Sequence, residues 1–205
     1  ARNADTFAYN ARSELTDALL GPDAYGCGYD GIGNLVFSAA CAVTNIYTAN
    51  CLNQYTDIVC ASASLRLDYD PDGNLLTNGV WSYAWNAENR LASASSNGVP
   101  IVSNAYDCQG RRFRKTLGAV TRTFVYDGWN LYREVEASGG QVVTNIYVWG
   151  LDLSGTLQGA GGVGGLLAVL RNGTPYFPCY DANGNVTDYV DAGGTVVAHR
   201  EYDPF

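Results

Sequence analysis

Residues 69–75 read Tyr69-Asp70-Pro71-Asp72-Gly73-Asn74-Leu75, and variants of this stretch recur along the chain. Close copies pair Tyr29-Asp30 with Gly33, Tyr106-Asp107 with Gly110 and Tyr180-Asp181 with Gly184, and degenerate copies lie at Tyr9-Asn10, Tyr83-Ala84-Trp85-Asn86, Tyr126-Asp127 and Tyr202-Asp203. Steps between tyrosines, such as 9 to 29, 106 to 126, 126 to 147 and 180 to 202, are 20, 20, 21 and 22 residues. A period of this size predicts a repeat architecture.

The letters of one unit predict a strand that enters a tight turn. The tyrosine closes an apolar-polar alternation, the aspartate can accept bonds from nearby backbone amides, and the glycine supplies a positive φ. Residues 80–85 and 142–149 alternate with period two. Turn dipeptides separate the alternating segments at Asn78-Gly79, Asn97-Gly98, Gly139-Gly140, Asn172-Gly173 and Gly193-Gly194, where we expect two-residue hairpin loops. Each period is therefore predicted to be one β-hairpin, in an all-β chain.

Composition agrees with this prediction. The chain has 24 Gly and 15 Tyr, and its 16% of charged residues is below the roughly 25% of an average soluble domain. No window of 11 or more residues keeps a helical apolar stripe, and the best candidate, 11–20, is expected to pair as a strand. The chain has no Met and begins and ends inside repeat units, so we interpret it as a segment of a longer protein.

Charge and hydropathy argue against two classes of partner. The net charge of −8 argues against nucleic acid, because phosphate binding needs clustered Lys and Arg. The basic run 111–115 is expected to be a solvated strand that leaves the turn at Tyr106-Asp107. No apolar run approaches the roughly 20 residues of a membrane span, so none is predicted.

No metal or cofactor is predicted. The six cysteines form no Cys-x-x-Cys pair and there is one histidine, so zinc is not expected. Most cysteines are expected to be small buried apolar residues. A disulfide between Cys41 and Cys51 is the alternative that the spacing leaves open. Asp70, Asp72 and Asn74, and the equivalent Asp181, Asn183 and Asn185, could form a partial calcium shell. The same side chains also satisfy turn backbones without a metal, which is the preferred interpretation.

Signatures of catalysis are also sparse. His199 is the one histidine and lies in an alternating segment, and no Gly-x-Ser-x-Gly elbow occurs. The glycine-rich run 155–165 lacks the Gly-Lys-Ser/Thr ending of a phosphate loop and is expected to be a flexible loop or a turn between strands. We therefore predict no enzyme and assign no catalytic residue.

Together these units resemble the Rhs/YD-repeat family of bacterial polymorphic toxins. The resemblance spans nearly the whole chain, and 180–205 resembles the start of the Rhs-associated core domain. It implies YD repeats over 1–175 and a truncated core domain over 176–205. The structural motif residues are Tyr29, Asp30, Gly33, Tyr69, Asp70, Gly73, Tyr106, Asp107, Gly110, Tyr126, Asp127, Tyr180, Asp181, Gly184, Tyr202 and Asp203. Tyr69, Tyr106, Tyr126 and Tyr180 are expected to be the most buried tyrosines.

The resemblance implies a function as well as a fold. Repeats of this family coil as a long spiralling β-sheet into a hollow shell around a C-terminal toxin domain of the same polypeptide. A secretion apparatus would be a further partner, and the location would be secreted or on the surface of a bacterium. The self-cleavage motif that closes the core domain in this family has no counterpart here, because the chain stops at Asp203-Pro204-Phe205. The alternative is a cell-surface adhesion module that binds glycans or other ligands through exposed Tyr and Trp.

Overall fold

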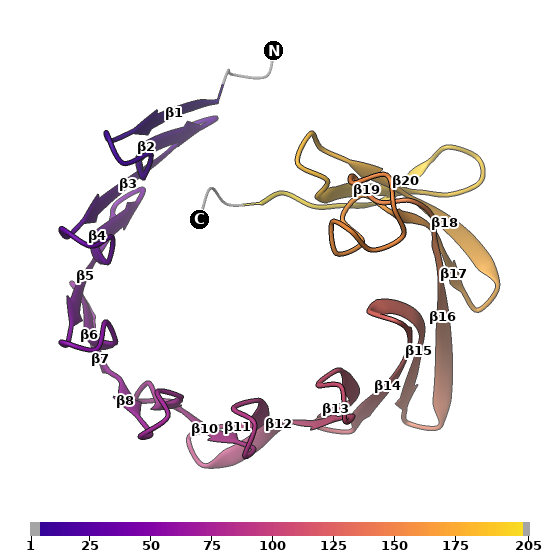
Figure 1. Ribbon diagram of the computed structural model, residues 1–205, viewed down its shortest axis with the longest axis horizontal. Coiled ribbons are helices and arrows are strands. Elements are labelled where there is room, and N and C mark those ends of the chain that lie inside the picture. Colours follow the sequence, from indigo (N-terminus) through magenta and orange to yellow (C-terminus); the bar gives the residue numbers. More distant parts are fainter. Residues whose placement is uncertain (1–4, 203–205) are drawn as a thin grey trace. The chain divides into compact units, whose positions relative to one another are not determined.

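A computed structural model describes residues 5–202, which form two compact units divided between Val99 and Pro100. The described residues contain twenty β-strands and no helix (Figure 1). The all-β prediction is confirmed. Residues 5–202 contain no helix that is long and apolar enough to cross a membrane.

The first unit holds the first eleven strands. They are β1 (Thr6–Tyr9), β2 (Leu15–Leu20), β3 (Asp23–Tyr29), β4 (Leu35–Ala40), β5 (Val43–Ala49), β6 (Tyr55–Cys60), β7 (Ala63–Arg66), β8 (Asp68–Tyr69), β9 (Leu75–Thr77), β10 (Trp81–Trp85) and β11 (Leu91–Ser96). Strands β1 to β7 form one antiparallel sheet in chain order, and β8 starts a second. Residues 11–20, expected to pair as a strand, contribute β2 from Leu15 onward, with the preceding residues in a turn.

The second unit continues the same pattern. Its strands are β12 (Val99–Tyr106), β13 (Arg112–Leu117), β14 (Val120–Asp127), β15 (Asn130–Ser138), β16 (Gln141–Trp149), β17 (Leu166–Arg171), β18 (Thr174–Tyr180), β19 (Val186–Val190) and β20 (Val196–His199). Neighbours in the sheet are again neighbours in the chain and run antiparallel. The basic run 111–115 enters β13, as predicted, and the side chains of Arg112 and Arg114 are exposed.

The two edges of the sheets are built differently. We call the edge that carries the loops after β1, β3, β5, β8, β10, β12, β14, β16 and β18 the turn edge. The opposite, hairpin edge has mostly two-residue loops. At Gly139-Gly140 and Asn172-Gly173 both loop residues have positive φ, the type I′ geometry that matches strand twist, and Asn97-Gly98 does the same.

Two of the five predicted hairpin loops are longer than expected. Asn78-Gly79 belongs to a three-residue loop, 78–80, in which the Asn78 amide bonds the Trp81 carbonyl. Gly193-Gly194 lies inside a five-residue loop, because Asp191 draws the backbone amides of Gly193 and Thr195 onto its carboxylate. At Gly193-Gly194, the side-chain acceptor ahead of the glycines therefore lengthens the loop.

The sheets are single layers with almost no core. The buried apolar residues are Ala18, Cys27, Ala94, Leu166 and Ala168, and no large described side chain is fully buried. The accessible surface is 12824 Å². Two compact domains of half this mass would expose about 11,200 Å² in total, and one compact domain about 9,300 Å². The excess reflects sheet faces that nothing covers.

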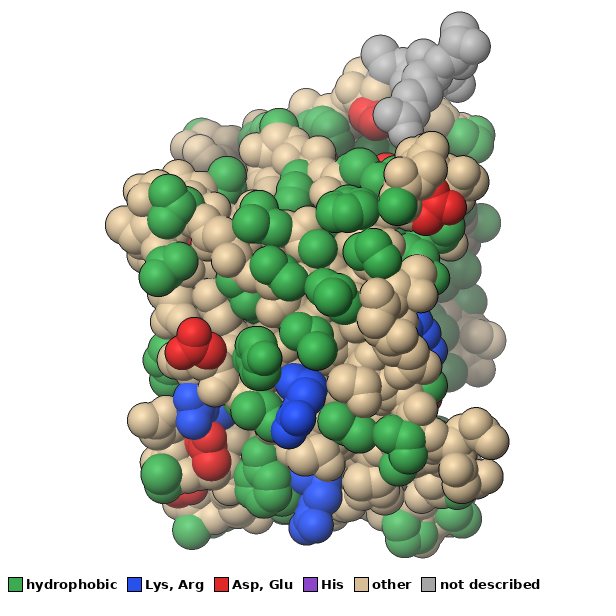
Figure 2. All heavy atoms as spheres, turned by 90° about the vertical axis from the view of Figure 1, so that its right-hand side faces the viewer, with side chains coloured by type: hydrophobic (Ala, Val, Ile, Leu, Met, Phe, Trp, Pro, Cys, Tyr) green, Lys and Arg blue, Asp and Glu red, His purple; other side chains and the backbone are tan. Residues whose placement is uncertain are grey.

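The alternation of side chains gives each sheet two different faces. Trp81, Tyr83 and Trp85 share one face of β10, as the period-two pattern predicted. The other face carries exposed apolar side chains: in the first unit the directly paired Phe37, Ile46 and Val59 are all exposed there. Figure 2, which views the side with β16 to β18, shows hydrophobic side chains gathered with few charges among them. Val125, Val148 and Phe177 lie on this apolar face of the second unit.

Candidate functional site: the turn edge

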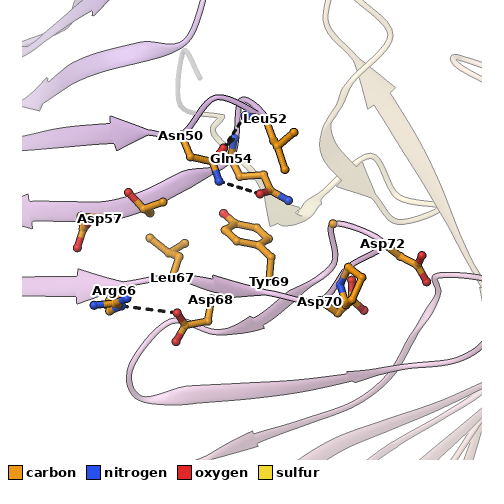
Figure 3. Close-up of a pocket in the computed structure, with 13 residues that line it drawn as sticks. Asn50, Leu52, Gln54, Asp57, Arg66, Leu67, Asp68, Tyr69, Asp70 and Asp72 are labelled. Carbon is orange, nitrogen blue, oxygen red and sulfur yellow. Dashed lines mark hydrogen bonds and ion pairs between the residues drawn. The ribbon is translucent and has the colours of Figure 1, made fainter.

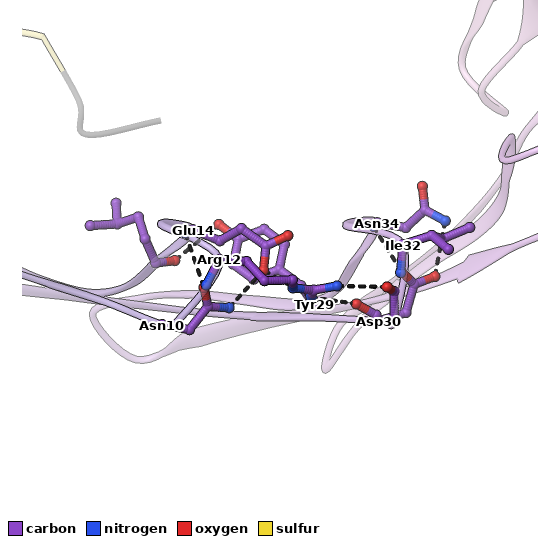
Figure 4. A network of polar contacts seen from close by, with 9 residues as sticks. Asn10, Arg12, Glu14, Tyr29, Asp30, Ile32 and Asn34 are labelled. Carbon is purple, nitrogen blue, oxygen red and sulfur yellow. Dashed lines mark hydrogen bonds and ion pairs between the residues drawn. The ribbon is translucent and has the colours of Figure 1, made fainter.

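A five-residue turn is the repeated element of this edge. In the Tyr29-Asp30 copy, Asp30 Oδ1 accepts bonds from the amides of Ile32 and Asn34, each at 2.9 Å (Figure 4). The Asp30 amide donates to the Asn34 carbonyl at 2.9 Å. Gly33 has a φ of +97°, where a residue with a Cβ would be strained. The hydrogen bonds to Asn34 and the backbone lower the pKa of Asp30.

The same geometry recurs along the described chain. The amide of the Asp or Asn donates to the carbonyl four residues later at Asn10, Asp30, Asn50, Asp70, Asn86, Asp107, Asp152, Asp181 and Asp191. The fourth residue has positive φ in every copy, as Ser13, Gly33, Asn53, Gly73, Asn89, Gly110, Gly155, Gly184 and Gly194. Asparagine replaces glycine in two copies because it tolerates the left-handed region better than most residues. All of these turns lie on the turn edge except that of Asp191, between β19 and β20.

An aromatic side chain ties most turns to the previous one. The tyrosine hydroxyl donates to the first residue of the strand after the preceding turn. The donor and acceptor pairs are Tyr29 to Leu15 (2.9 Å), Tyr69 to Tyr55 (2.8 Å), Tyr126 to Arg112 (2.9 Å), Tyr180 to Leu166 (2.6 Å) and Tyr202 to Val186 (2.8 Å). The indole NH groups of Trp85 and Trp149 donate in a similar way to the carbonyls of Leu75 (2.8 Å), the first residue of β9, and Leu131 (2.7 Å), the second residue of β15. These tyrosines and tryptophans therefore have the same structural role.

The pairing register explains where these bonds form. The strand pairing shifts by one residue directly before the aromatic side chain, for example between Gly28 and Tyr29 and between Cys179 and Tyr180. A bulge of this kind bends a strand and re-aims a side chain. Partial burial raises the pKa of Tyr69, Tyr126 and Tyr180. These tyrosines and Tyr106 are half-buried, since no second layer covers the sheet.

Adjacent turns also bond to each other directly. The Arg12 guanidinium donates to the carbonyls of Asp30 (2.6 Å) and Gly31 (2.7 Å), as Figure 4 shows. Asn74 Nδ2 donates to Asn89 Oδ1 at 2.9 Å. Such contacts make the turn edge a ladder of linked turns.

One predicted copy departs from the motif. Asp127 pairs with Asn130 across a two-residue loop of Gly128 and Trp129, because the glycine directly follows the aspartate. Arg111 reaches over from the previous turn to the Gly128 carbonyl and pairs with Asp107 at 2.8 Å. Asp203, in the last predicted copy, lies outside the described residues.

The sequence pattern missed three copies, at Asn50, Asp152 and Asp191, because no tyrosine precedes them. The signal that could have found them is an Asp or Asn followed three residues later by Gly or Asn. At Asn50, the position before the turn is occupied by Ala49 in place of a tyrosine. The hydroxyl of Tyr55, which starts the next strand β6, accepts a hydrogen bond from the Leu35 amide at 2.7 Å. An aromatic hydroxyl is thus present near this turn too.

The glycine-rich segment is an ordered loop wound around Asp152. This residue is 6% exposed. Its carboxylate accepts bonds from the hydroxyl and amide of Ser154 on one oxygen and from the amides of Ala160 (2.6 Å) and Gly162 (3.1 Å) on the other. These bonds, with that of the Ser154 hydroxyl first, lower the pKa of Asp152 to about 2. The loop does lie between two strands, β16 and β17, as expected.

The loop packs against turns on both sides. Gln158 Nε2 donates to the Asp127 carbonyl at 3.1 Å, and Asn130 Nδ2 donates to the Leu157 carbonyl at 3.4 Å. On the other side, Gly184 approaches Val163 and Leu153 so closely that a Cβ on it would lie 2.7 Å from Val163 Cγ1. The Asp152 loop therefore joins the turns of Asp127 and Asp181.

A polar cluster around the buried Glu134 lies on one face of the sheet in the second unit. Glu134 is 9% exposed, and its Oε2 accepts bonds from the Tyr147 hydroxyl (2.8 Å) and Asn145 Nδ2 (3.2 Å). Arg122 Nε lies 3.6 Å from Glu134 Oε1 and pairs with Glu136 at 2.6 Å. Burial, then the Glu134 carboxylate, raises the pKa of Tyr147. The cluster links β14, β15 and β16.

An open hollow of about 800 Å³ lies where β7 ends and β8 starts (Figure 3). Asp57, Asp68, Asp70 and Asp72 line it, with Arg66 3.6 Å from Asp68. The Asp70 carboxylate accepts the Asn74 amide at 2.8 Å and Asn74 Nδ2 at 2.9 Å. Its oxygens therefore satisfy the turn. Across the described residues, no group of three or more His, Cys, Asp or Glu side chains is arranged to hold a metal ion.

The expectation of buried cysteines is wrong for this fold. All six are free thiols, Cys27 is buried, and Cys41, Cys51, Cys108 and Cys179 are exposed. A single-layer sheet has few buried positions, and three of the exposed cysteines lie in loops. His199 lies in β20, as expected for a strand histidine, with Nδ1 2.7 Å from Asp188 and Nε2 3.4 Å from Glu201. These carboxylates raise its pKa.

Comparison with known proteins identifies a family whose repeats match the repeated turns of this edge. A family model described as the Teneurin YD-shell matches residues 1–205. The chain belongs to this family. The resemblance to Rhs/YD-repeat proteins is confirmed, and the chain is a segment of a YD shell.

Relatives and solved structures extend the comparison. The chain is 31% identical over 182 residues to the tRNA3(Ser)-specific nuclease WapA of Bacillus spizizenii, covering 85% of this chain and 7% of that protein. It is 31% identical over 129 residues to double-stranded DNA deaminase toxin A of Burkholderia cenocepacia, covering 54% of this chain and 8% of that protein. The Photorhabdus luminescens Tc holotoxin pore structure shares 13% identity with a TM-score of 0.48, covering 98% of this chain and 14% of that one.

Proposed function

We propose that this chain is part of the wall of a shell that encloses a C-terminal toxin domain of the same polypeptide. The observation that carries the proposal is the single-layer sheet, with an accessible surface of 12824 Å² and only five buried apolar residues among residues 5–202. Such a sheet has no interior of its own, so it acts by separating two spaces. Of the relatives, one is a tRNA nuclease and another a DNA deaminase toxin by name, and the chain covers less than a tenth of either.

The residues of the YD motif hold the wall together in this proposal and perform no chemistry. Tyr29, Tyr69, Tyr126 and Tyr180 each donate to a backbone carbonyl of the previous repeat, and their aspartates or turn partners cap loops. Any toxin activity lies outside residues 1–205. The polypeptide would be secreted or carried on the surface of a bacterium, with a secretion apparatus as a further partner.

The division of the chain is part of the same proposal. Residues 1–175 would be YD repeats and 176–205 the start of the Rhs-associated core domain. The turn at Asp181 and the bond from Tyr202 to Val186 have the same geometry as the earlier repeats. The wall would therefore continue without interruption into the core domain.

The complete natural polypeptide tests the proposal. We expect its C-terminal domain to resist added protease as long as the shell is intact, whereas the same domain expressed alone is cut. The intact mass should also show two co-eluting fragments if the shell cleaves itself. Equal rates of cleavage for the domain in the complete protein and alone would refute enclosure. A single chain without a variable C-terminal domain would favour adhesion.

A further inference from the structure

The strand pairing of the first unit is interrupted where its two sheets meet. Strands β7 and β8 form one stretch, 63–69, that is broken at Leu67. Residues 63–66 of this stretch pair with β6 and residues 68–69 pair with β9, so none of them is paired on both sides. In β3, by contrast, Tyr25 is paired with β2 on one side and with β4 on the other. The two sheets that meet at this stretch therefore share no paired residue there.

The strand that follows is too short to strengthen this connection. β9 has three residues, with two pairs to β8 and one pair, Thr77 with Ser82, to β10. β4, at the same place in an earlier repeat, has five pairs with β3 and four with β5. The hairpin after β9 closes early because the Asn78 amide bonds the Trp81 carbonyl at 3.1 Å. We call residues 63–77 the β7–β9 joint.

Two hydrogen bonds tie the part of the joint beyond β7 to the start of β6. The Leu67 amide donates to the Thr56 carbonyl at 2.8 Å. The Tyr69 hydroxyl donates to the Tyr55 carbonyl, also at 2.8 Å. In an uninterrupted ladder, a bond such as that of Tyr69 adds to strand pairing on both sides. Here it takes the place of such pairing, so the joint depends on it more strongly than other repeats do.

The side chains around the break add little to these bonds. Arg66 and Asp68 form an ion pair at 3.6 Å, but their side chains are 82% and 55% exposed, and exposed pairs contribute little. The open hollow of about 800 Å³ lies here in place of packed side chains (Figure 3). Asp57 lines it from β6, and Asp68, Asp70 and Asp72 line it from β8 and the turn beyond. Repulsion between these carboxylates opposes closure of the joint at low ionic strength.

We propose that the wall opens at the β7–β9 joint, by separation of β8 and β9 from β6 while the strands on both sides keep their pairing. Segments of a protein open locally where backbone hydrogen bonds are few and the surface around them is uncovered, and this joint has both properties. The inference rests on the proposed wall function, because an opening exposes an enclosed domain only if the wall encloses one. It deepens that function by naming the place at which the enclosed domain becomes accessible.

Hydrogen exchange of the complete protein, followed by mass spectrometry, tests the opening. Relative to their intrinsic rates, we expect the amides of residues 67–77 to exchange faster than those of 35–49, which cover β4 and β5. The variant Tyr69→Phe removes the hydroxyl bond to β6 and should speed exchange at the joint by about 2- to 12-fold, the equivalent of one hydrogen bond. Tyr29→Phe is the matched control, because it removes the same kind of bond, to β2 at 2.9 Å, from an uninterrupted ladder.

Cleavage of the C-terminal domain by added protease is measured on the same samples. We expect Tyr69→Phe to speed this cleavage by the same factor and Tyr29→Phe to leave it at the wild-type rate. Equal exchange of the joint and of residues 35–49 in the wild type would overturn the inference. Unchanged cleavage in Tyr69→Phe, with the domain still protected relative to the same domain alone, would also overturn it. A domain that is cut equally fast in the complete wild type and alone refutes the proposed function, whereas the exchange rates test the joint independently.

Discussion

Two glycines with the same backbone geometry but different surroundings provide a stringent test of the turn edge. Gly184 and Gly194 are the fourth residues of the turns at Asp181 and Asp191, with φ of +81° and +83°. A Cβ on Gly184 would lie 2.7 Å from Val163 and 3.1 Å from Leu153, whereas a Cβ on Gly194 would meet nothing within 4 Å. Alanine at each position therefore separates backbone strain from the packing of the Asp152 loop.

The expected losses of unfolding free energy follow from backbone strain and from overpacking. The left-handed conformation costs an L-residue about 1–2 kcal/mol, which applies to both variants. Overpacking adds about 1–3 kcal/mol at Gly184 alone. We expect Gly194→Ala to lose about 1–2 kcal/mol and Gly184→Ala about 2–5 kcal/mol of unfolding free energy. Urea denaturation of both variants and the wild type, followed by far-ultraviolet circular dichroism, measures the difference.

The comparison can fail in two ways. Equal losses for the two variants would mean that the loop of residues 150–165 does not pack on the turn of Asp181. Wild-type stability in both would mean that these glycines do not need positive φ, and the turn assignment would be wrong. The bulkier Gly73→Val and Gly184→Val should show the same order of effects, since a Cβ on Gly73 lies no closer than 3.4 Å to any neighbour.

Three further predictions concern side chains. Tyr180→Phe removes the bond to the Leu166 carbonyl and should cost about 0.5–1.5 kcal/mol by urea denaturation, against a smaller effect of Tyr132→Phe at an exposed position. The pKa of Asp152 is lowered from 3.8 to about 2, so its carboxylate stabilises the fold fully above pH 3.8. This stabilisation is lost as the pH falls toward 2. In an acid titration, Asp152→Asn should therefore lose less unfolding free energy between these pH values than the wild type does. The pKa of His199 is raised above 6.5, so its contribution to stability is complete below that pH and is lost as the pH rises through the raised pKa. We therefore expect His199→Ala to reduce the melting temperature more at about pH 5.5 than at about pH 9. An equal reduction at both pH values would contradict the ion pairs.

Local chemistry explains why so much of the fold could be predicted from sequence. The pair Tyr-Asp with a glycine three residues after the aspartate specifies an end of strand, a side-chain acceptor and a positive φ, all within seven residues. Gly139-Gly140 and Asn172-Gly173 likewise contain their own turn geometry. The prediction for Gly193-Gly194 was wrong because the Asp191 carboxylate, two residues before Gly193, accepts the amides of Gly193 and Thr195 and so forms a longer loop. The turn type depended on that neighbour as well as on the dipeptide.

The features that sequence could not predict depend on distant residues. Asp152 is buried by amides up to ten residues away, and nothing in its immediate neighbours distinguishes it from an exposed loop aspartate. Glu134 contacts Tyr147 across a strand pair whose register arises only in the folded sheet. The exposed cysteines were mispredicted because the burial tendency of cysteine assumes a two-layered core, which this sheet lacks.

Three kinds of bond explain how the motif can vary without loss of the fold. Each turn is held by its own Asp or Asn, most turns are also held by an aromatic group that reaches the previous repeat, and several are held by a side chain of the adjacent turn. Where Ala49 replaces the tyrosine, Asn50 still accepts the amides of Leu52 (2.9 Å) and Gln54 (3.0 Å). Because a repeat sheet is stabilised mainly by contacts between neighbours, the loss of one bond weakens one junction only. Selection can therefore relax the tyrosine in single repeats, as the Ala49 copy shows, provided that the turn and the strand pairing persist.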